Sequence, residues 1–150
     1  MQTFKIQNYE REHGPGTFAP FRHMTGGETE NFRAALRRRM EMPDGVSPID
    51  IVLEIQKRSV LIPSVNAEAD TFDLGLVLNQ LAFDVSETTY LNWYQLDDID
   101  EMLTRDVIVR FSDIWYPSSD DLELIDSRIR WVLSVHHSGI VKALSFTPGR

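Results

Sequence analysis

The adjacent pair His136-His137 is the first candidate for chemistry, because histidine is a common general base and metal ligand. The residues before the pair alternate as a strand, with apolar side chains on one face at Ile129, Trp131, Leu133 and Val135. Adjacent residues of a strand point to opposite faces, so the pattern places His137 on the apolar face and His136 on the other. We therefore expect two structural histidines beside a turn, and no metal ion held by both.

A second cluster contains only acids: Asp97, Asp98, Asp100 and Glu101. A calcium loop of the EF-hand type needs glycine at its sixth position, where this sequence has Met102. Acids in the first turn of a helix are stabilised by the helix dipole, which predicts a short helix from Asp97 to Leu103. The alternative is an acidic recognition surface, whose second part would be Asp120, Asp121 and Glu123.

Enzyme motifs are not found in the sequence. It has no cysteine, and it lacks a nucleophile elbow, a phosphate-binding loop and an HExxH helix. We therefore predict no catalytic residues, no cofactor and no metal. The alternative left open is a small hydrolase or metal-dependent enzyme that uses His136 or His137. It would require one of these histidines to lie beside Asp113, Asp120 or Asp121 at the floor of a pocket.

Negative charge is concentrated in the middle of the chain. Residues 61–126 contain fifteen acids and two bases, whereas residues 1–60 contain eight acids and nine bases, and the whole chain has a net charge of −8. Such a field attracts basic partners and repels phosphate backbones. We therefore predict a basic protein partner and no direct binding of nucleic acid. The alternative is that the acids only keep the domain in solution.

Five aromatic residues of the second half are most simply explained as sheet core: Trp93, Tyr94, Trp115, Tyr116 and Trp131. Trp115-Tyr116 precedes the polar loop that begins at Pro117, so this pair is also a candidate anchor of an interface rimmed by acids. The predicted partner-binding set is Asp97, Asp98, Asp100, Glu101, Trp115, Tyr116, Asp120, Asp121 and Glu123.

The first half of the chain is predicted to be helical after an irregular arm at residues 1–27, with a short strand at Thr3–Gln7. Phe32, Leu36 and Met40 form one apolar stripe, which predicts a helix from about Thr25. Ser47-Pro48 predicts the start of a second helix that ends near Arg58. We expect a loop at Ser64–Ala69 and a third helix from about Thr71 to Phe83.

The second half is rich in β-branched and aromatic residues and predicts strands. We expect them at Tyr90–Tyr94, Val107–Phe111, Leu122–Ile125, Ile129–Val135 and Ile140–Phe146. The predicted fold is therefore α+β, one domain over residues 1–150 with N-terminal helices packed on a C-terminal antiparallel meander. No apolar run reaches the length of a membrane span and the N-terminus lacks a secretory signal, so we expect a cytoplasmic protein.

Two stretches of the second half resemble a known class of proteins. They are Phe111-Ser112-Asp113-Ile114-Trp115-Tyr116-Pro117-Ser118-Ser119-Asp120-Asp121 and Trp131-Val132-Leu133-Ser134-Val135-His136-His137-Ser138-Gly139. Their spacing of Trp, Asp-Asp and His-Ser-Gly is similar to that of small bacterial α+β immunity proteins of polymorphic toxin systems. The resemblance implies a non-enzymatic protein that binds and blocks a toxin domain. A phage-encoded inhibitor that mimics nucleic acid would have the same charge.

Overall fold

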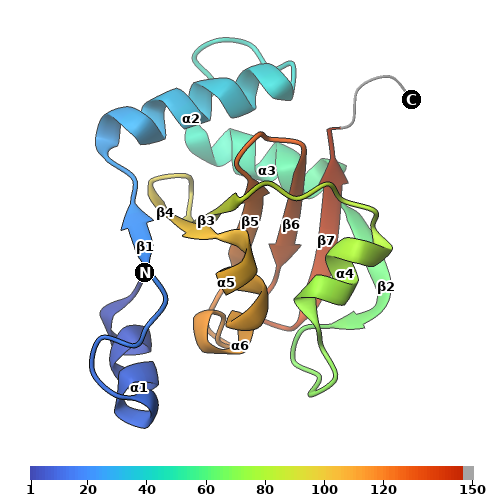
Figure 1. Ribbon diagram of the computed structural model, residues 1–150. Helices are drawn as coiled ribbons and strands as arrows, with labels where there is room; N and C mark the ends of the chain where they lie inside the picture. Colours follow the sequence, from blue (N-terminus) through green and yellow to red (C-terminus); the bar gives the residue numbers. More distant parts are fainter. Residues whose placement is uncertain (147–150) are drawn as a thin grey trace.

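A single antiparallel sheet organises the protein (Figure 1). The computed structural model describes residues 1–146, and within them seven strands pair in the order β1–β4–β3–β5–β6–β7–β2. The strands are β1 (Phe21–His23), β2 (Val60–Asn66), β3 (Thr88–Tyr94), β4 (Asp98–Leu103), β5 (Leu122–Asp126), β6 (Trp131–Val135) and β7 (Ile140–Ser145). The two edge strands come from the first half of the chain, so the meander predicted for the second half forms the interior of the sheet.

Helices cover both faces of this sheet. They are α1 (Thr3–His13), α2 (Gly26–Arg39), α3 (Pro48–Arg58), α4 (Leu74–Gln80), α5 (Thr104–Val109) and α6 (Phe111–Ile114). Helices α2 and α3 share one apolar core with the sheet, and α1, α4, α5 and α6 share a second core on the opposite face. The fold is therefore α+β, as predicted. None of the helices in the described part of the chain is long and apolar enough to cross a membrane.

Strand β6 shows how the sequence forms two cores. Trp131, Leu133 and Val135 pack on the side of α4 and α6, whereas Val132 packs on the side of α2 and α3. All four side chains are buried, which explains why the strand is apolar on both faces. The alternation predicted for this strand is confirmed from Trp131 to Val135. Ile129 was assigned wrongly, because it precedes the strand at a φ of +52° and packs in the same core as Val132.

The helix starts predicted from local motifs are also confirmed. Thr25 and Glu28 form a reciprocal capping box at α2, and Ser47 caps α3 with Pro48 in the first turn. The third predicted helix is shorter than expected, because α4 begins only after its cap, Asp73. Strand β2 extends to Asn66, into the segment predicted as a loop.

The N-terminal prediction was wrong, because residues 3–13 form a helix. The buried residues of α1 are Lys5 and Tyr9, which lie four apart on one side of the helix. Lys5 is fully buried and forms an ion pair with Asp120. A helix that buries a lysine has no clear apolar stripe, which is why its period could not be recognised.

Two further predictions in the middle of the chain were wrong. Residues 98–103 form strand β4, because the β3–β4 turn places both Gln95 and Leu96 at positive φ and returns the chain along β3. The predicted strand at Val107–Phe111 is replaced by α5 and α6. The buried residues there are Val107, Phe111 and Ile114, which follow helical spacing, and Val109 is 76% exposed.

The burial of Trp131 provides a test of this packing. Its side chain is 1% exposed, stacks on Phe83 and donates its indole N–H to the carbonyl of Asp84 at 3.1 Å. We expect Trp131→Ala to lower the free energy of unfolding by about 3 to 5 kcal/mol, because truncation leaves a large cavity. Tyr94→Ala, at an aromatic residue that is 62% exposed, is the control and should change stability by less than about 1 kcal/mol. Urea denaturation of both variants measures the difference; equal stabilities would contradict the assignment of faces.

Candidate functional site

A row of polar side chains crosses the interior of the sheet. Asn92 of β3 pairs with Glu123 of β5, Glu123 with Ser134 of β6, and Ser134 with Lys142 of β7. The adjacent row on the same face contains Tyr90, Ile125, Val132 and Leu144, which pack in the core beneath α2 and α3. The polar row therefore lies one step beyond the apolar core on the α3 side of the sheet.

A cleft of about 500 Å³ lies above this polar row. Val52 and Gln56 of α3 form one wall, and Tyr94 and Gln95 of the β3–β4 hairpin form another. Asp121 and His136, which directly adjoin β5 and β6, also line the cleft. It therefore combines apolar walls with several polar groups, as small ligand sites and anchor pockets do.

Glu123 is the most unusual group in the cleft. The residue is only 7% exposed, and Asn92 donates an amide N–H to its Oε2 at 2.8 Å. Its Oε1 has no hydrogen-bond partner within the described residues, and neither does Oγ of Ser134. Burial raises the pKa of Glu123 to about 7. The carboxyl group can thus take up or release a proton near neutral pH.

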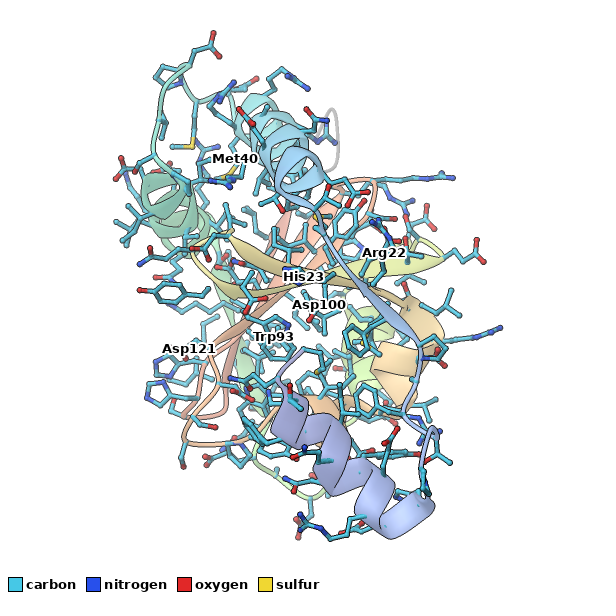
Figure 2. All side chains as sticks on the ribbon, turned by 90° about the vertical axis from the view of Figure 1, so that its left-hand side faces the viewer. Arg22, His23, Met40, Trp93, Asp100 and Asp121 are labelled. Carbon is cyan, nitrogen blue, oxygen red and sulfur yellow. The ribbon has the colours of Figure 1, made fainter. Side chains whose placement is uncertain are left out.

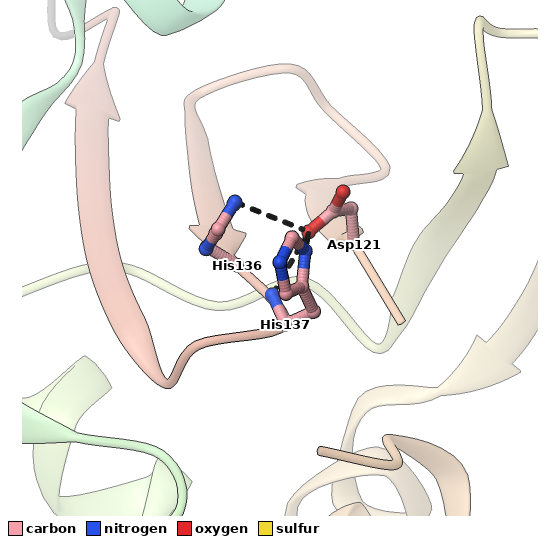
Figure 3. A group of neighbouring side chains, drawn as sticks. All are labelled: Asp121, His136 and His137. Carbon is pink, nitrogen blue, oxygen red and sulfur yellow. Dashed lines mark hydrogen bonds and ion pairs between the residues drawn. The ribbon is translucent and has the colours of Figure 1, made fainter. Parts of the chain in front are cut away.

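Asp121, His136 and His137 gather beside the cleft (Figure 3). Asp121 Oδ1 lies 2.9 Å from Nδ1 of His137 and 3.8 Å from Nε2 of His136. Partial burial of Asp121 opposes its ionisation, but the hydrogen bonds from the His137 backbone and ring hold its pKa below the ordinary value. The expectation that the two histidines point apart was wrong, because β6 ends at Val135 and the pair belongs to the following turn.

Four residues of the predicted partner-binding set are buried: Asp100, Trp115, Asp120 and Glu123. Asp100 bonds to the amino group of Met1 and accepts the indole N–H of Trp93 at 2.9 Å (Figure 2). Asp120 pairs with Lys5, and its carbonyl accepts the indole N–H of Trp115 at 2.9 Å. Asp100, Trp115 and Asp120 therefore hold the fold together and are not available to a partner in this conformation, whereas Glu123 lies in the cleft.

The other members of the set are at least partly accessible. Asp97 and Asp121 are exposed, and the side chain of Asp98 is 49% exposed. Glu101 lies 3.6 Å from Arg22, and Tyr116 is half-buried against Phe4 of α1. Of these acids, Asp121 lines the cleft. Asp97 donates its backbone N–H to the carbonyl of Tyr94 at 3.0 Å, and Asp98 pairs with Tyr94 in the sheet.

Sequence reasoning missed several residues of the cleft. Tyr94 was assigned to the core, but it is 62% exposed at the end of β3. Asn92, Ser134 and Lys142 drew no attention, because each is a single polar residue inside an apolar strand. Such interruptions are a usable signal only when the pairing register is known, since the register is what aligns them with Glu123.

The raised pKa of Glu123 predicts how stability depends on pH. The folded protein binds this proton more tightly than the unfolded chain, so Glu123 makes stability fall as pH rises from about 5 to about 8. We expect Glu123→Gln to remove this dependence and to stabilise the protein at pH 8 by up to about 3 kcal/mol. Urea denaturation at several pH values tests this, with the exposed Glu87→Gln as control. A pH profile that is the same in Glu123→Gln and in the unmodified protein would refute the assignment.

Comparisons with known proteins give no family for this chain. Neither a family model, nor a curated protein, nor a solved structure matches it. A fold class alone does not determine function, so the function has to be argued from the chemistry of the cleft and its surroundings. The residues that carry this argument are the accessible acids, the exposed Tyr94 and the polar groups beneath them.

Proposed function

We propose that the protein is a non-enzymatic binding protein that inhibits a basic protein partner. The concrete form is an immunity protein that neutralises a bacterial toxin in the cytoplasm by occluding it. The observation that supports this proposal best is the exposed Tyr94 with accessible acids close to it. We refer to Tyr94, Asp97, Asp98 and Asp121 as the acidic surface.

Sheet topology explains why two separate acidic segments approach each other. Strand β3 lies between β4 and β5. Asp98 of β4 pairs with Tyr94, and Asp121 lines the same cleft as Tyr94. The acids around residue 98 and those around residue 121 therefore lie on either side of one strand. Their charges act together on an approaching partner, although more than twenty residues separate them in the sequence.

The acidic surface has the composition that a recognition site for a basic protein requires. Tyrosine supplies a large contact area with few rotatable bonds, and it is enriched among the residues that dominate binding energy. Carboxylates at the rim mainly accelerate encounter with a partner of opposite charge. Gln95 and the cleft beside Tyr94 give a partner side chain room to enter.

A small hydrolase is the second candidate, and one observation favours it. His137 Nδ1 lies 2.9 Å from Asp121 Oδ1 beside a cleft that contains Glu123, which is the proximity that general-base catalysis needs. The side chains of His137 and Asp121 are 46% and 65% exposed, so water has ready access to the pair. Hydrolysis of an activated ester that is lost in His137→Ala and retained in His23→Ala would favour this function over the first.

The kinetic test replaces Asp97, Asp98 and Asp121 by asparagine. Where the gene immediately upstream encodes a large secreted protein with a toxic C-terminal domain, that domain is the partner to purify. We expect the triple variant to associate about tenfold more slowly at low salt, with a smaller change in dissociation, because rim charges mainly set the association rate. Raising the salt to physiological strength should slow the unmodified protein more than the variant. Stopped-flow fluorescence measures both rates.

A matched control removes three exposed acids elsewhere, through Glu30→Gln, Glu68→Gln and Asp70→Asn. It changes the net charge by the same amount, so it separates a local recognition surface from the overall charge. If the control slows association as much as the triple variant does, the acidic surface is not the site of recognition. Cells that express the toxic domain should grow only when this protein is co-expressed. Death of the cells despite co-expression would count against the proposal.

The role of Tyr94 is tested separately through dissociation. We expect Tyr94→Ala to weaken binding by about 2 kcal/mol or more, mostly through faster dissociation, because the ring is proposed as the central contact. Tyr94→Phe keeps the ring and loses only the hydroxyl group, which accepts a hydrogen bond from Gln95 at 3.1 Å. The phenylalanine variant should therefore bind nearly as well as the unmodified protein. Equal, unchanged affinities in both variants would show that the partner does not bind over Tyr94.

A further inference from the structure

The turn between β6 and β7 determines how the two adjacent histidines are placed. The His136 backbone N–H donates to the carbonyl of Ile140 at 2.9 Å, and that of Gly139 donates to the carbonyl of His136 at 2.8 Å. Gly139 has a φ of +89°, and a Cβ at this position would collide with the side chain of Asn66. Glycine is therefore required for this turn. Because strand alternation ends at Val135, both imidazoles can lie on the same side as Asp121.

We propose that Asp121, His136 and His137 form a binding site for one divalent transition-metal ion of the zinc class. In a tetrahedral zinc site with bonds of about 2.0 to 2.1 Å, neighbouring donor atoms are about 3.4 Å apart. The distances from Asp121 Oδ1 are 2.9 Å to His137 and 3.8 Å to His136, on either side of that value. One donor atom from each of the three residues lies within 4.8 Å of the others. The proposed site therefore requires only small rotations of the three side chains to bring one donor atom of each onto the ion.

Groups around the three donors already orient them. Ser138 Oγ lies 2.7 Å from Nδ1 of His136, which leaves Nε2 of that ring on the side of Asp121. The backbone N–H of His137 donates to Oδ1 of Asp121 at 2.8 Å and so holds the carboxylate. Hydrogen bonds of this kind fix the ring orientation and the carboxylate in protein metal sites. The site therefore has part of its outer shell before any ion binds.

The donor set determines which ions fit. Two imidazoles and one carboxylate suit Zn²⁺, Co²⁺, Ni²⁺ or Cu²⁺, whereas Ca²⁺ and Mg²⁺ prefer sites built of oxygen alone. The three side chains are 46 to 65% exposed, so water or a further ligand can complete the coordination. Asp121 and His136 line the cleft above Glu123, so an ion held here would border that cleft.

A second group of the described residues, His23, Asp98 and Asp100, also brings three such donors together. It is a poorer site for two reasons. It contains only one imidazole, and Asp100 is buried in bonds with the amino group of Met1 and the indole N–H of Trp93. An ion at Asp100 would meet the positive charge of the amino group. His23 therefore serves as an internal control, because it lies beside aspartates but outside the proposed site.

The test is titration of the purified protein alone with Zn²⁺ by calorimetry, with Co²⁺ absorption as a second readout. It does not rest on the proposed partner. We expect one ion per chain, bound in the presence of excess Ca²⁺. His136→Ala, His137→Ala and Asp121→Asn should each weaken binding by about tenfold or more, and Ser138→Ala by less. His23→Ala should leave the affinity unchanged. The side chains of His23, Asp121, His136 and His137 are 46 to 65% exposed, so these substitutions leave the core intact. Circular dichroism checks that each variant is folded.

Three outcomes would overturn the inference. The first is the absence of saturable Zn²⁺ binding by the unmodified protein. The second is unchanged affinity in both His136→Ala and His137→Ala, which would place any bound ion elsewhere. The third is a loss of binding in His23→Ala equal to that in His136→Ala, which would favour the second group. Partner binding is measured without added metal, so failure of the Zn²⁺ test leaves the proposed function standing. Failure of the partner-binding test likewise leaves the proposed metal site standing.

Discussion

Helices cover both faces of the central sheet, so each polar group within it must find a partner inside the protein or face a cleft. Several carboxylates meet this constraint by fastening other elements to the sheet. Asp120 holds Lys5 of α1, and Asp126 accepts the backbone N–H of Ser86 and pairs with Arg130. Four of the fifteen acids of residues 61–126 are therefore buried: Asp100, Asp120, Glu123 and Asp126. The charge that a partner would meet comes from the remaining accessible acids, which include those close to Tyr94.

The cleft lies where this internal pairing is incomplete. Asn92 satisfies one oxygen of Glu123 and, through its own carbonyl, the backbone N–H of Leu96. The other oxygen of Glu123 and the hydroxyl of Ser134 remain without protein partners within residues 1–146. Because buried polar groups are costly to leave unpaired, their presence in a cleft points to a site that water or a ligand completes. Tyr94 and Asp121 of the acidic surface line this same cleft, together with His136.

Local motifs predicted much of the fold but little of the site. The caps at Thr25 and Ser47 and the apolar strands β5 to β7 depend on neighbouring residues, so they could be recognised in the sequence. Helix α1 and strand β4 depend on partners far along the chain, and their local signals were weak or pointed to another structure. The same applies to Asp100 and Asp120. The sequence shows that they are acidic, but only the fold shows that Asp100 pairs with the amino group of Met1 and Asp120 with Lys5.

The β3–β4 turn affects how Tyr94 is presented. Gln95 and Leu96 have φ values of +42° and +60°, in the left-handed region that costs non-glycine residues about 1 kcal/mol each. The complete burial of Leu96 and its hydrogen bond to Asn92 hold the turn in this form. The hairpin is therefore preorganised, and its ordering takes place during folding rather than on contact with a partner. A rigid aromatic side chain on such a turn loses little conformational entropy when it is covered.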